Sequence, residues 1–440
     1  MRLPVFVFSL AALLSCRASR APEVTRPPVP AAAPELRKGE SDPLDSHALA
    51  TMVPPGSAPV DKLIADLEAR VGHVPKVDNW VVLGQAWVRK ARETADPVYY
   101  LNADACADQA LRLDPKSTQA LELRTLLQLS NHQFARARDT GEAALAKRSD
   151  LPLMLGLISD ADLELGDYDG AERRAQEMMN LKPCLPSYSR VSYLHWLHGD
   201  QKAALESVRL AIDSGDPKEP EAVAWVLVQA AMIFWNQGDV AGADAGFDRA
   251  LTTFPDFPPA LVGKGRVALA RDDPKRAAAL FDQAFHLSPL METAWLLTDA
   301  RTEAGDAAGA AASDAVLAKQ GVATDPRTTA LYWATHDREH ARALEVAAAE
   351  RQTRDDLYTE DTYAWALYRA GKIPEARAAS DKALILNTPD ARLLYHAGAI
   401  RLAQGQRIEG LALVRKALAL NPHFDVTGAR EARALVATAR

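Results

Sequence analysis

A small residue returns along this chain at a nearly constant interval of about 34 residues. The positions are Ala103, Ala137, Ala171, Ala204, Ala243, Ala277, Ala310, Ala341 and Ala376, with Gly410 in the last copy. The segment from Gln237 to Pro255 also holds Phe247 and Ala250, so one face stays apolar at the period of a helix. A single unit of this size cannot bury its apolar face alone, so the repeat predicts a stack of similar units.

Turn-forming residues occur in the same register. A glycine ends the first apolar segment of several units, at Gly166, Gly199, Gly238, Gly305, Gly371 and Gly405. A proline follows the second segment of several units, at Pro115, Pro183, Pro255, Pro289 and Pro422. Glycine readily adopts the left-handed conformation that ends a helix, and proline cannot continue one. Each unit is therefore predicted to be two helices joined by a tight turn.

This combination of period, turn glycine and closing proline resembles the tetratricopeptide repeat (TPR) family, over about residues 77 to 422. The resemblance implies an all-α, right-handed α-solenoid of about ten helix pairs with short capping helices. We place the solenoid at residues 77–427, an N-terminal capping helix at 61–76 and a C-terminal capping helix at 428–440. The shortest copy spans Leu331 to Ala349.

The N-terminus has the pattern of an export signal. After Arg2, residues Leu3 to Leu14 are apolar but too few to span a bilayer as a permanent helix. The run LLSC, which ends at Cys16, resembles the lipobox of bacterial lipoproteins. The resemblance implies lipid modification of the Cys16 thiol and cleavage just before it. The alternative is ordinary secretory cleavage near Ala18 or Ala21.

Residues 1–16 are thus assigned to a lipoprotein signal peptide, and residues 17–60 to a disordered tether. The tether is rich in proline and alanine, so it cannot bury enough apolar surface to offset the entropy of ordering. Asp61 to Val71, with Leu63, Ile64 and Leu67, reads as an amphipathic capping helix. An insert from about Val88 to Asn102 either lengthens both helices of the first unit or forms a lip.

Charge and cysteine content narrow the function classes. The formal net charge of the 440 residues is −7, and we find no dense lysine and arginine run of the kind that nucleic-acid binding requires. No nucleic-acid partner is therefore predicted. Cys106 and Cys184 lie two units apart, too far for a disulfide, and are predicted to be free thiols.

No catalytic pattern is recognisable in the sequence. It contains no glycine-rich phosphate loop, G-x-S-x-G elbow or HExxH motif. His195 and His198 share a predicted helix, but no third ligand stands beside them in sequence. His336 and His340 would share one helical face if a single helix carried both, whereas a polar turn explains them without a metal. We therefore predict no enzyme activity, no cofactor and no metal.

Aromatic residues gather at particular positions of the repeat register. In TPR proteins the first helix of each repeat lines a concave groove. Trp80 and Trp87 fall on buried consensus positions, whereas other rings fall on groove-type positions. The predicted partner-binding groove consists of Tyr193, Trp196, Trp225, Trp235, Trp295, Trp333, Trp365, Tyr368 and Tyr395. Either these rings form an exposed apolar trough that marks a binding site, or they pack against neighbouring first helices and are buried.

Some TPR proteins clamp a C-terminal carboxylate with Lys and Asn side chains at the ninth position of successive repeats. The corresponding positions here hold Gln85, Leu126, Asp160, Tyr193 and Met232, so that clamp is not expected.

The sequence as a whole favours a non-catalytic, exported and lipid-anchored scaffold that binds a protein or peptide partner. Arg17 rather than an aspartate follows the lipobox cysteine, which in a Gram-negative cell favours the periplasmic face of the outer membrane. One alternative is an assembly factor for an outer-membrane machine, of the pilus-secretin or β-barrel type. Another is an accessory subunit of an envelope enzyme. The partner and the oligomeric state stay open.

Overall fold

The computed structural model describes residues 43–54, 56–94 and 96–438, and all regular secondary structure in these ranges is α-helical. Across them, no helix is both long enough and apolar enough to cross a lipid bilayer. The predicted signal peptide with Cys16 lies outside the described residues.

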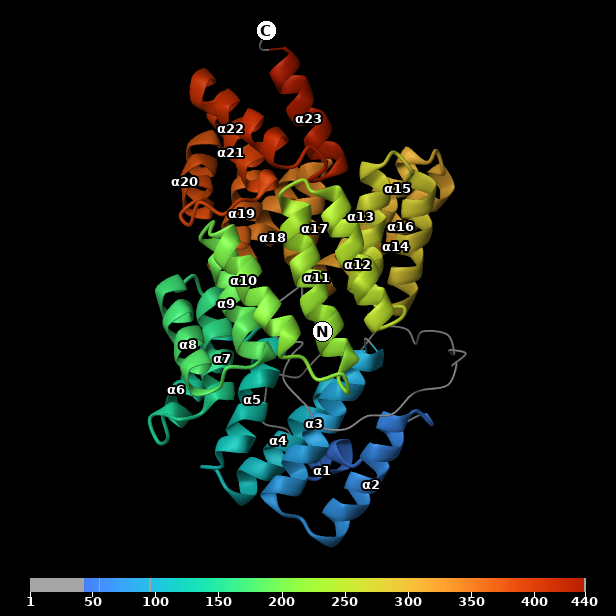
Figure 1. Ribbon diagram of the computed structural model, residues 1–440, viewed down its shortest axis with the longest axis vertical. Helices are drawn as coiled ribbons and strands as arrows, with labels where there is room; N and C mark the ends of the chain where they lie inside the picture. Colours follow the sequence, from blue (N-terminus) through green and yellow to red (C-terminus); the bar gives the residue numbers. More distant parts are fainter. Residues whose placement is uncertain (1–42, 55, 95, 439–440) are drawn as a thin grey trace.

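Consecutive helices pair along the chain, and α3 to α22 form ten pairs. The first half of the chain contains α1 (Pro43–Ala50), α2 (Pro59–His73), α3 (Val77–Thr94), α4 (Tyr99–Leu113), α5 (Thr118–Ser130), α6 (Phe134–Leu145), α7 (Pro152–Glu164), α8 (Tyr168–Leu181), α9 (Leu185–Leu197), α10 (Gln201–Asp213), α11 (Pro220–Asn236) and α12 (Val240–Thr253). Figure 1 shows these helices, in blue and green, at one end and in the middle of the long axis.

The second half continues the same arrangement. It contains α13 (Pro258–Ala270), α14 (Pro274–Leu287), α15 (Met291–Glu303), α16 (Ala307–Thr324), α17 (Pro326–Thr335), α18 (His340–Glu350), α19 (Leu357–Arg369), α20 (Ile373–Ala383), α21 (Ala391–Ala403), α22 (Arg407–Leu420) and α23 (Val426–Ala437). The red C-terminal helices occupy the opposite end of the molecule (Figure 1). The predicted all-α solenoid of helix pairs is confirmed.

In six of the ten pairs the turn between the two helices contains a glycine. All six turn glycines have positive φ, between 74° at Gly238 and 80° at Gly405, a region that glycine enters without steric cost. The aspartate that follows several of them caps the second helix. For example, the Asp239 carboxylate accepts a hydrogen bond from the Gly242 backbone N–H at 2.8 Å. The glycine–aspartate pair therefore ends one helix and begins the next.

The recurring alanine lies where the two helices of a pair approach. Eight of the nine predicted alanines are buried, most of them completely, but Ala341 is exposed and Ala343 of α18 is buried instead. The prediction at Ala341 is wrong because the turn before α18, residues 336–339, is one residue longer than the turns before α6 and α14, which also lack glycine but keep the predicted alanine buried. Asp337 and Glu339 both adopt positive φ there, and the longer turn shifts the register.

The N-terminal region differs from its prediction in one respect. Residues 43–50, placed in the tether by composition, form α1, and Ala50 is completely buried. The Trp87 indole donates from Nε1 to the Ala50 carbonyl at 3.1 Å, and the Asn102 amide donates from Nδ2 to the Leu49 carbonyl at 2.7 Å. Because these contacts satisfy the last turn of α1, the folded body begins before residue 61.

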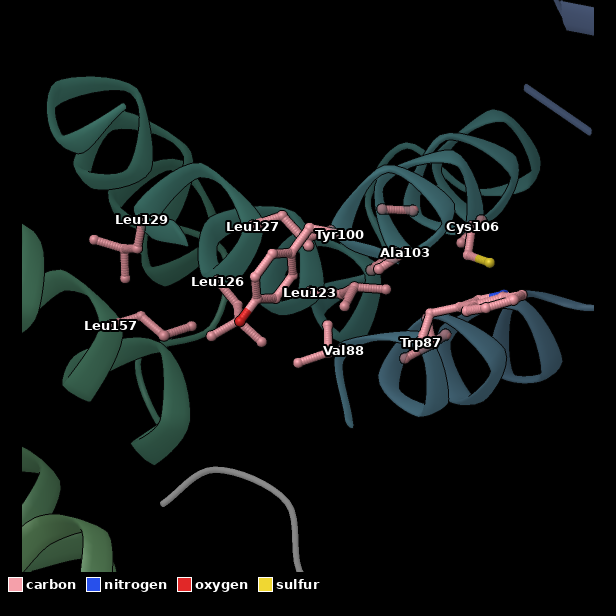
Figure 2. Packing of buried hydrophobic residues seen from close by; sticks show 14 of the residues in the cluster. Trp87, Val88, Tyr100, Ala103, Cys106, Leu123, Leu126, Leu127, Leu129 and Leu157 are labelled. Carbon is pink, nitrogen blue, oxygen red and sulfur yellow. The ribbon is translucent and has the colours of Figure 1, made fainter. Parts of the chain in front are cut away.

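The capping helix α2 and the first pair are otherwise close to expectation. Ile64, Leu67 and Val71 are buried, whereas Leu63, predicted on the same face, is 39% exposed. The insert lengthens both helices of the pair, since α3 runs to Thr94 and α4 begins at Tyr99. Figure 2 shows α3, α4 and α5 packing through the side chains of Trp87, Val88, Tyr100, Ala103, Cys106, Leu123, Leu126 and Leu127.

Early and late repeats touch each other directly. The C-terminal ends of α7, α9 and α11 meet the turns that precede α19, α21 and α23. Three hydrogen bonds make these contacts: Asp355 N–H to the Glu164 carbonyl (3.0 Å), Thr388 Oγ1 to the Leu197 carbonyl (2.7 Å) and Asn421 Nδ2 to the Trp235 carbonyl (2.9 Å). We call this line of contacts the seam. It joins helices about 190 residues apart and fixes the first helices around a common interior.

Candidate functional site

A cavity of about 210 Å³ lies in that interior. Every first helix from α9 to α21 contributes to its wall, so the concave side expected from the repeat register is the side that lines it. The turn before α23 adds Asn421 and Phe424. Because the seam brings α9 and α11 against the late repeats, the wall combines residues that are far apart in sequence.

Five of the nine predicted groove residues line this cavity: Tyr193, Trp196, Trp225, Trp235 and Trp295. Trp196, Trp235 and Trp295 are buried, with 4%, 3% and 6% of their surface exposed. Tyr193 and Trp225 are half-buried, so the cavity keeps contact with solvent along them. The aromatic side chains thus form the wall of a hollow and not an open surface.

The other four predicted residues lie elsewhere. Trp333 is 4% exposed, and the Arg342 guanidinium lies 4.9 Å above its ring. Trp365 and Tyr395 are each 1% exposed, and Trp365 stacks on His396 with ring centroids 4.0 Å apart. Tyr368, which is half-buried, stacks on Trp365 in the same cluster.

The open aromatic trough is therefore not what the structure shows, and the alternative of rings packed between first helices describes Trp365 and Tyr395, whose ring centroids lie 5.4 Å apart. The burial of Tyr395 has a physical cause in the C-terminal cap. The Tyr395 hydroxyl donates to a Glu431 carboxylate oxygen of α23, which covers this cluster. Partner binding by the nine residues stays a prediction.

Three arginines that sequence reasoning did not single out also line the cavity. Arg266 donates from Nη2 to Glu292 Oε1 at 2.6 Å, and Arg327 donates from Nη1 to Asp356 Oδ1 at 3.1 Å. Arg392 lies at the beginning of α21, with its Nε 4.0 Å from Asp361 Oδ2. The sequence signal that could have identified Arg327 and Arg392 is their position in the first turn of a first helix.

The pKa values of Arg392, Tyr193 and Tyr358 in the wall are all raised. Burial alone would lower the pKa of Arg392, but the charges of Asp390 and Asp361 outweigh it and raise the pKa. Burial also raises the pKa of Tyr193 and Tyr358 well above the usual range of a phenol. The wall therefore presents guanidinium ions and protonated phenols, which bind ligands but do not readily exchange protons.

The two histidines contact different aspartates and do not form a shared site. His336 contacts Asp299 Oδ1 through Nε2 at 2.8 Å, and His340 contacts Asp337 Oδ1 at 2.9 Å. The two do not share a helix, because α17 ends at Thr335 and α18 begins at His340. Residues 43–54, 56–94 and 96–438 contain no cluster of three or more potential ligands suited to a metal ion.

The cysteines and the first-repeat tryptophans lie where the sequence placed them. Cys106 is completely buried and Cys184 is partly exposed, and both are free thiols. Trp80 and Trp87, expected in the core, are 2% and 0% exposed.

Comparison with known proteins bears on the fold. No protein-family model and no curated protein matches this chain. Among solved structures, PilW, a widely conserved type IV pilus biogenesis factor, is 17% identical, with a TM-score of 0.39 and coverage of 46% of this chain and 93% of PilW. A tetratricopeptide repeat protein from Parabacteroides merdae is 17% identical, with a TM-score of 0.41 and coverage of 54% and 91%.

Human IFIT1, solved as a dimer with PPP-AAAA, is 13% identical, with a TM-score of 0.46 and coverage of 86% of this chain and 94% of that one. Identities this low transfer no ligand or partner to this chain. Its own helix pairs, left-handed turn glycines and buried alanines carry the assignment. By fold, the protein is an all-α solenoid of helix pairs, and a tetratricopeptide repeat protein is among the solved structures that it resembles.

Proposed function

We propose that the protein is a non-catalytic scaffold that holds a polypeptide partner at its aromatic cavity and is anchored to the bacterial cell envelope through a lipid on Cys16. The observation that carries the binding role is the cavity itself, with Trp196, Trp225, Trp235 and Trp295 in its wall. Aromatic side chains lose little conformational entropy on binding and supply large apolar contact areas, which makes them frequent anchors for peptides.

The energetics support a binding role of moderate affinity. Fully burying one apolar side chain of a partner contributes about 1.5–3 kcal/mol. One such group in the cavity therefore accounts for part of an affinity, and the rest must come from contacts along the adjoining first helices. The half-buried Tyr193, Trp225 and Tyr358 supply such contacts where the cavity meets solvent.

The experiment that tests the scaffold role compares two variants in crosslinked capture from the native envelope. Trp225→Ala removes a half-buried ring of the cavity wall. The matched control is Ile408→Ala, which removes an apolar side chain that is 89% exposed and outside the cavity wall. We expect Trp225→Ala to lose a partner that the wild type and Ile408→Ala both retain. Equal capture by all three proteins, each shown to be folded by circular dichroism, would contradict the proposal.

The anchor needs a separate test because it depends on residues outside the described part. Cells are fed a labelled fatty acid, and incorporation into the wild type is compared with incorporation into Cys16→Ala. We expect label in the wild type alone, together with sedimentation of the wild type with membranes. Equal labelling of both chains would exclude the lipid. Fractionation of inner and outer membranes then tests the proposed location at the periplasmic face of the outer membrane.

A further inference from the structure

The wall of the cavity holds more hydrogen-bond donors than the surrounding protein uses. Arg266 uses Nη2 and Arg327 uses Nη1, and within residues 43–54, 56–94 and 96–438 neither makes a side-chain hydrogen bond through its other nitrogens. The carboxylates that line the same cavity, Glu292 and Asp390, already accept hydrogen bonds from protein groups. A ligand with hydrogen-bond acceptors can therefore bind the arginine nitrogens that make no hydrogen bond within the protein.

Of the three arginines that line the cavity, Arg392 makes the fewest side-chain hydrogen bonds. Its guanidinium makes no hydrogen bond to any residue that the structure describes, and its buried Nε, which lies 4.0 Å from Asp361 Oδ2, has no hydrogen-bond partner. The side chain lies over the Tyr358 ring, with 5.9 Å between the guanidinium carbon and the ring centroid. Since a buried donor that makes no hydrogen bond destabilises the protein, an acceptor placed at Arg392 would gain a favourable hydrogen bond.

Two aspartates beside Arg392 limit the charge of that acceptor. Asp361 accepts from His396 Nδ1 at 3.0 Å, and Asp390 caps α21 by accepting from its own helix. Both hold Arg392 in place and both repel an incoming anion. A group with one negative charge can be accommodated by the fork of a guanidinium, whereas a phosphate, with a charge of about −1.5 to −2, meets stronger repulsion.

Volume limits the apolar part of the ligand. A cavity of about 150 Å³ lined by apolar side chains holds a benzene molecule. The cavity here is about 210 Å³, which leaves room for a ring of that size together with a small polar group. A whole helix or an extended peptide does not fit, but a single terminal residue or a small acid does.

We propose that the cavity takes one residue-sized apolar or aromatic group that carries a carboxylate, with the carboxylate on the Arg392 guanidinium and the apolar part among Trp225, Trp235 and Trp295. The proposal rests on the cavity's proposed role in binding and names the group that enters it. This chemistry is found in free aromatic acids and in the C-terminal residue of a polypeptide.

The test measures binding by tryptophan emission and by titration calorimetry. One pair of probes is 3-phenylpropionate and its neutral amide, and the second is a short peptide ending in phenylalanine with a free or an amidated C-terminus. We expect each acid to bind about tenfold more tightly than its amide, as charge-assisted hydrogen bonds to a guanidinium are stronger than neutral ones. A larger preference in the peptide pair identifies a polypeptide terminus as the source, and a preference in the small pair alone identifies a free acid.

Three variants complete the test. Arg392→Gln should abolish the preference for the acids, and Arg392→Lys, which keeps the charge without the fork, should keep part of it. Arg415→Gln, at an exposed arginine of α22, is the control and should keep all of it. Equal affinity for acid and amide in the wild type, or an acid preference that survives in Arg392→Gln, overturns the proposal. If partner capture still depends on Trp225 in that case, the scaffold role stands and only the carboxylate is wrong.

Discussion

Arg354 donates from Nη1 to Glu164 Oε2 at 3.1 Å, although 190 residues separate them in sequence. The same guanidinium reaches His132 Nδ1 through Nη2 at 2.7 Å and lies 5.0 Å from the Phe134 ring centroid. Arg354 is 1% exposed, so its charge depends on these partners. It therefore ties the turn between α18 and α19 to the ends of α5 and α7, at one end of the seam that shapes the cavity.

Replacing Arg354 by methionine should destabilise the protein by about 3–5 kcal/mol, because it leaves Glu164 buried without its partner. Urea unfolding followed by circular dichroism measures the loss. Arg209→Met is the control, since Arg209 pairs with Asp213 on the surface, where 70% and 61% of the two side chains are exposed. The control should change stability by less than about 1 kcal/mol. A loss of the same small size in Arg354→Met would show that the seam is not held by this residue.

A glycine inside a helix provides the second prediction. Gly265 lies in α13, where a Cβ atom would come within 2.4 Å of the Phe281 ring of α14. Phe281 is completely buried, so it cannot move aside easily. Gly265→Ala should therefore destabilise the protein by about 1–3 kcal/mol through overpacking, although alanine favours helix by about 1 kcal/mol.

Gly72 of α2 is the matched control for Gly265. A Cβ atom at Gly72 meets nothing within 4 Å, so Gly72→Ala should stabilise the protein by up to about 1 kcal/mol. Thermal unfolding of both variants measures the opposite signs. If Gly265→Ala also raised the melting temperature, the close approach of α13 and α14 would be refuted.

The two described cysteines should differ strongly in reactivity. Cys106 is completely buried, and burial raises the pKa of its thiol well above the usual range, whereas Cys184 is partly exposed. Only the thiolate reacts rapidly with maleimides. In a Cys16→Ser background, N-ethylmaleimide should modify Cys184 within minutes and Cys106 only when the protein opens. Mass spectrometry of peptides after timed quenching measures both rates.

The control for this labelling is the same reaction in denaturant, where both thiols should react at similar rates. The variant Cys184→Ser should remain unlabelled in its folded state. Fast labelling of Cys106 in that variant would mean that α1 and α2 do not cover α3 and α4 as the structure describes.

The fold was largely predictable because it depends on local requirements. Two helices pack closely only where a small residue lies between them, and a tight turn needs a residue with left-handed backbone. The recurring alanines and glycines therefore indicate where the helix pairs lie. The prediction failed where a turn changes length. The turn before α18 spans residues 336–339, one residue more than the glycine-free turns before α6 and α14, and the buried alanine there is Ala343. In α1, tertiary contacts at Ala50 order a segment whose composition favours disorder.

The candidate site was less predictable because it depends on curvature, which no single repeat encodes. Trp196 and Arg392 line the same cavity only because the seam brings α9 to the turn before α21. Periodicity placed Trp365 and Tyr395 on the concave side, but it could not reveal that α23 covers them. Five of the nine aromatic residues named from the sequence line the cavity, and the arginines that give the cavity its polarity were not named.

His336 makes the stability of the protein depend on pH in a definite direction. Both of its ring nitrogens face acceptors, since Nδ1 lies 2.9 Å from the Tyr332 carbonyl and Nε2 lies 2.8 Å from Asp299 Oδ1. Burial alone would lower the pKa of His336, but the hydrogen bond and the charge of Asp299 outweigh it and raise the pKa above 6.5. The folded protein therefore binds this proton more tightly than the unfolded chain does.

The stabilisation from His336 should accordingly be complete below the unfolded pKa of about 6.5 and be lost as the pH rises through the higher folded pKa. The measurement is the free energy of unfolding of the wild type minus that of His336→Gln, taken at a series of pH values. Subtraction removes the contribution of the other titrating groups. His198→Gln, in an exposed turn, controls for the substitution itself. We expect the difference to be largest in acid and to fall toward alkaline pH. A difference that instead grew as the pH rose would mean that the folded protein disfavours the imidazolium, and the ion pair with Asp299 would then not form.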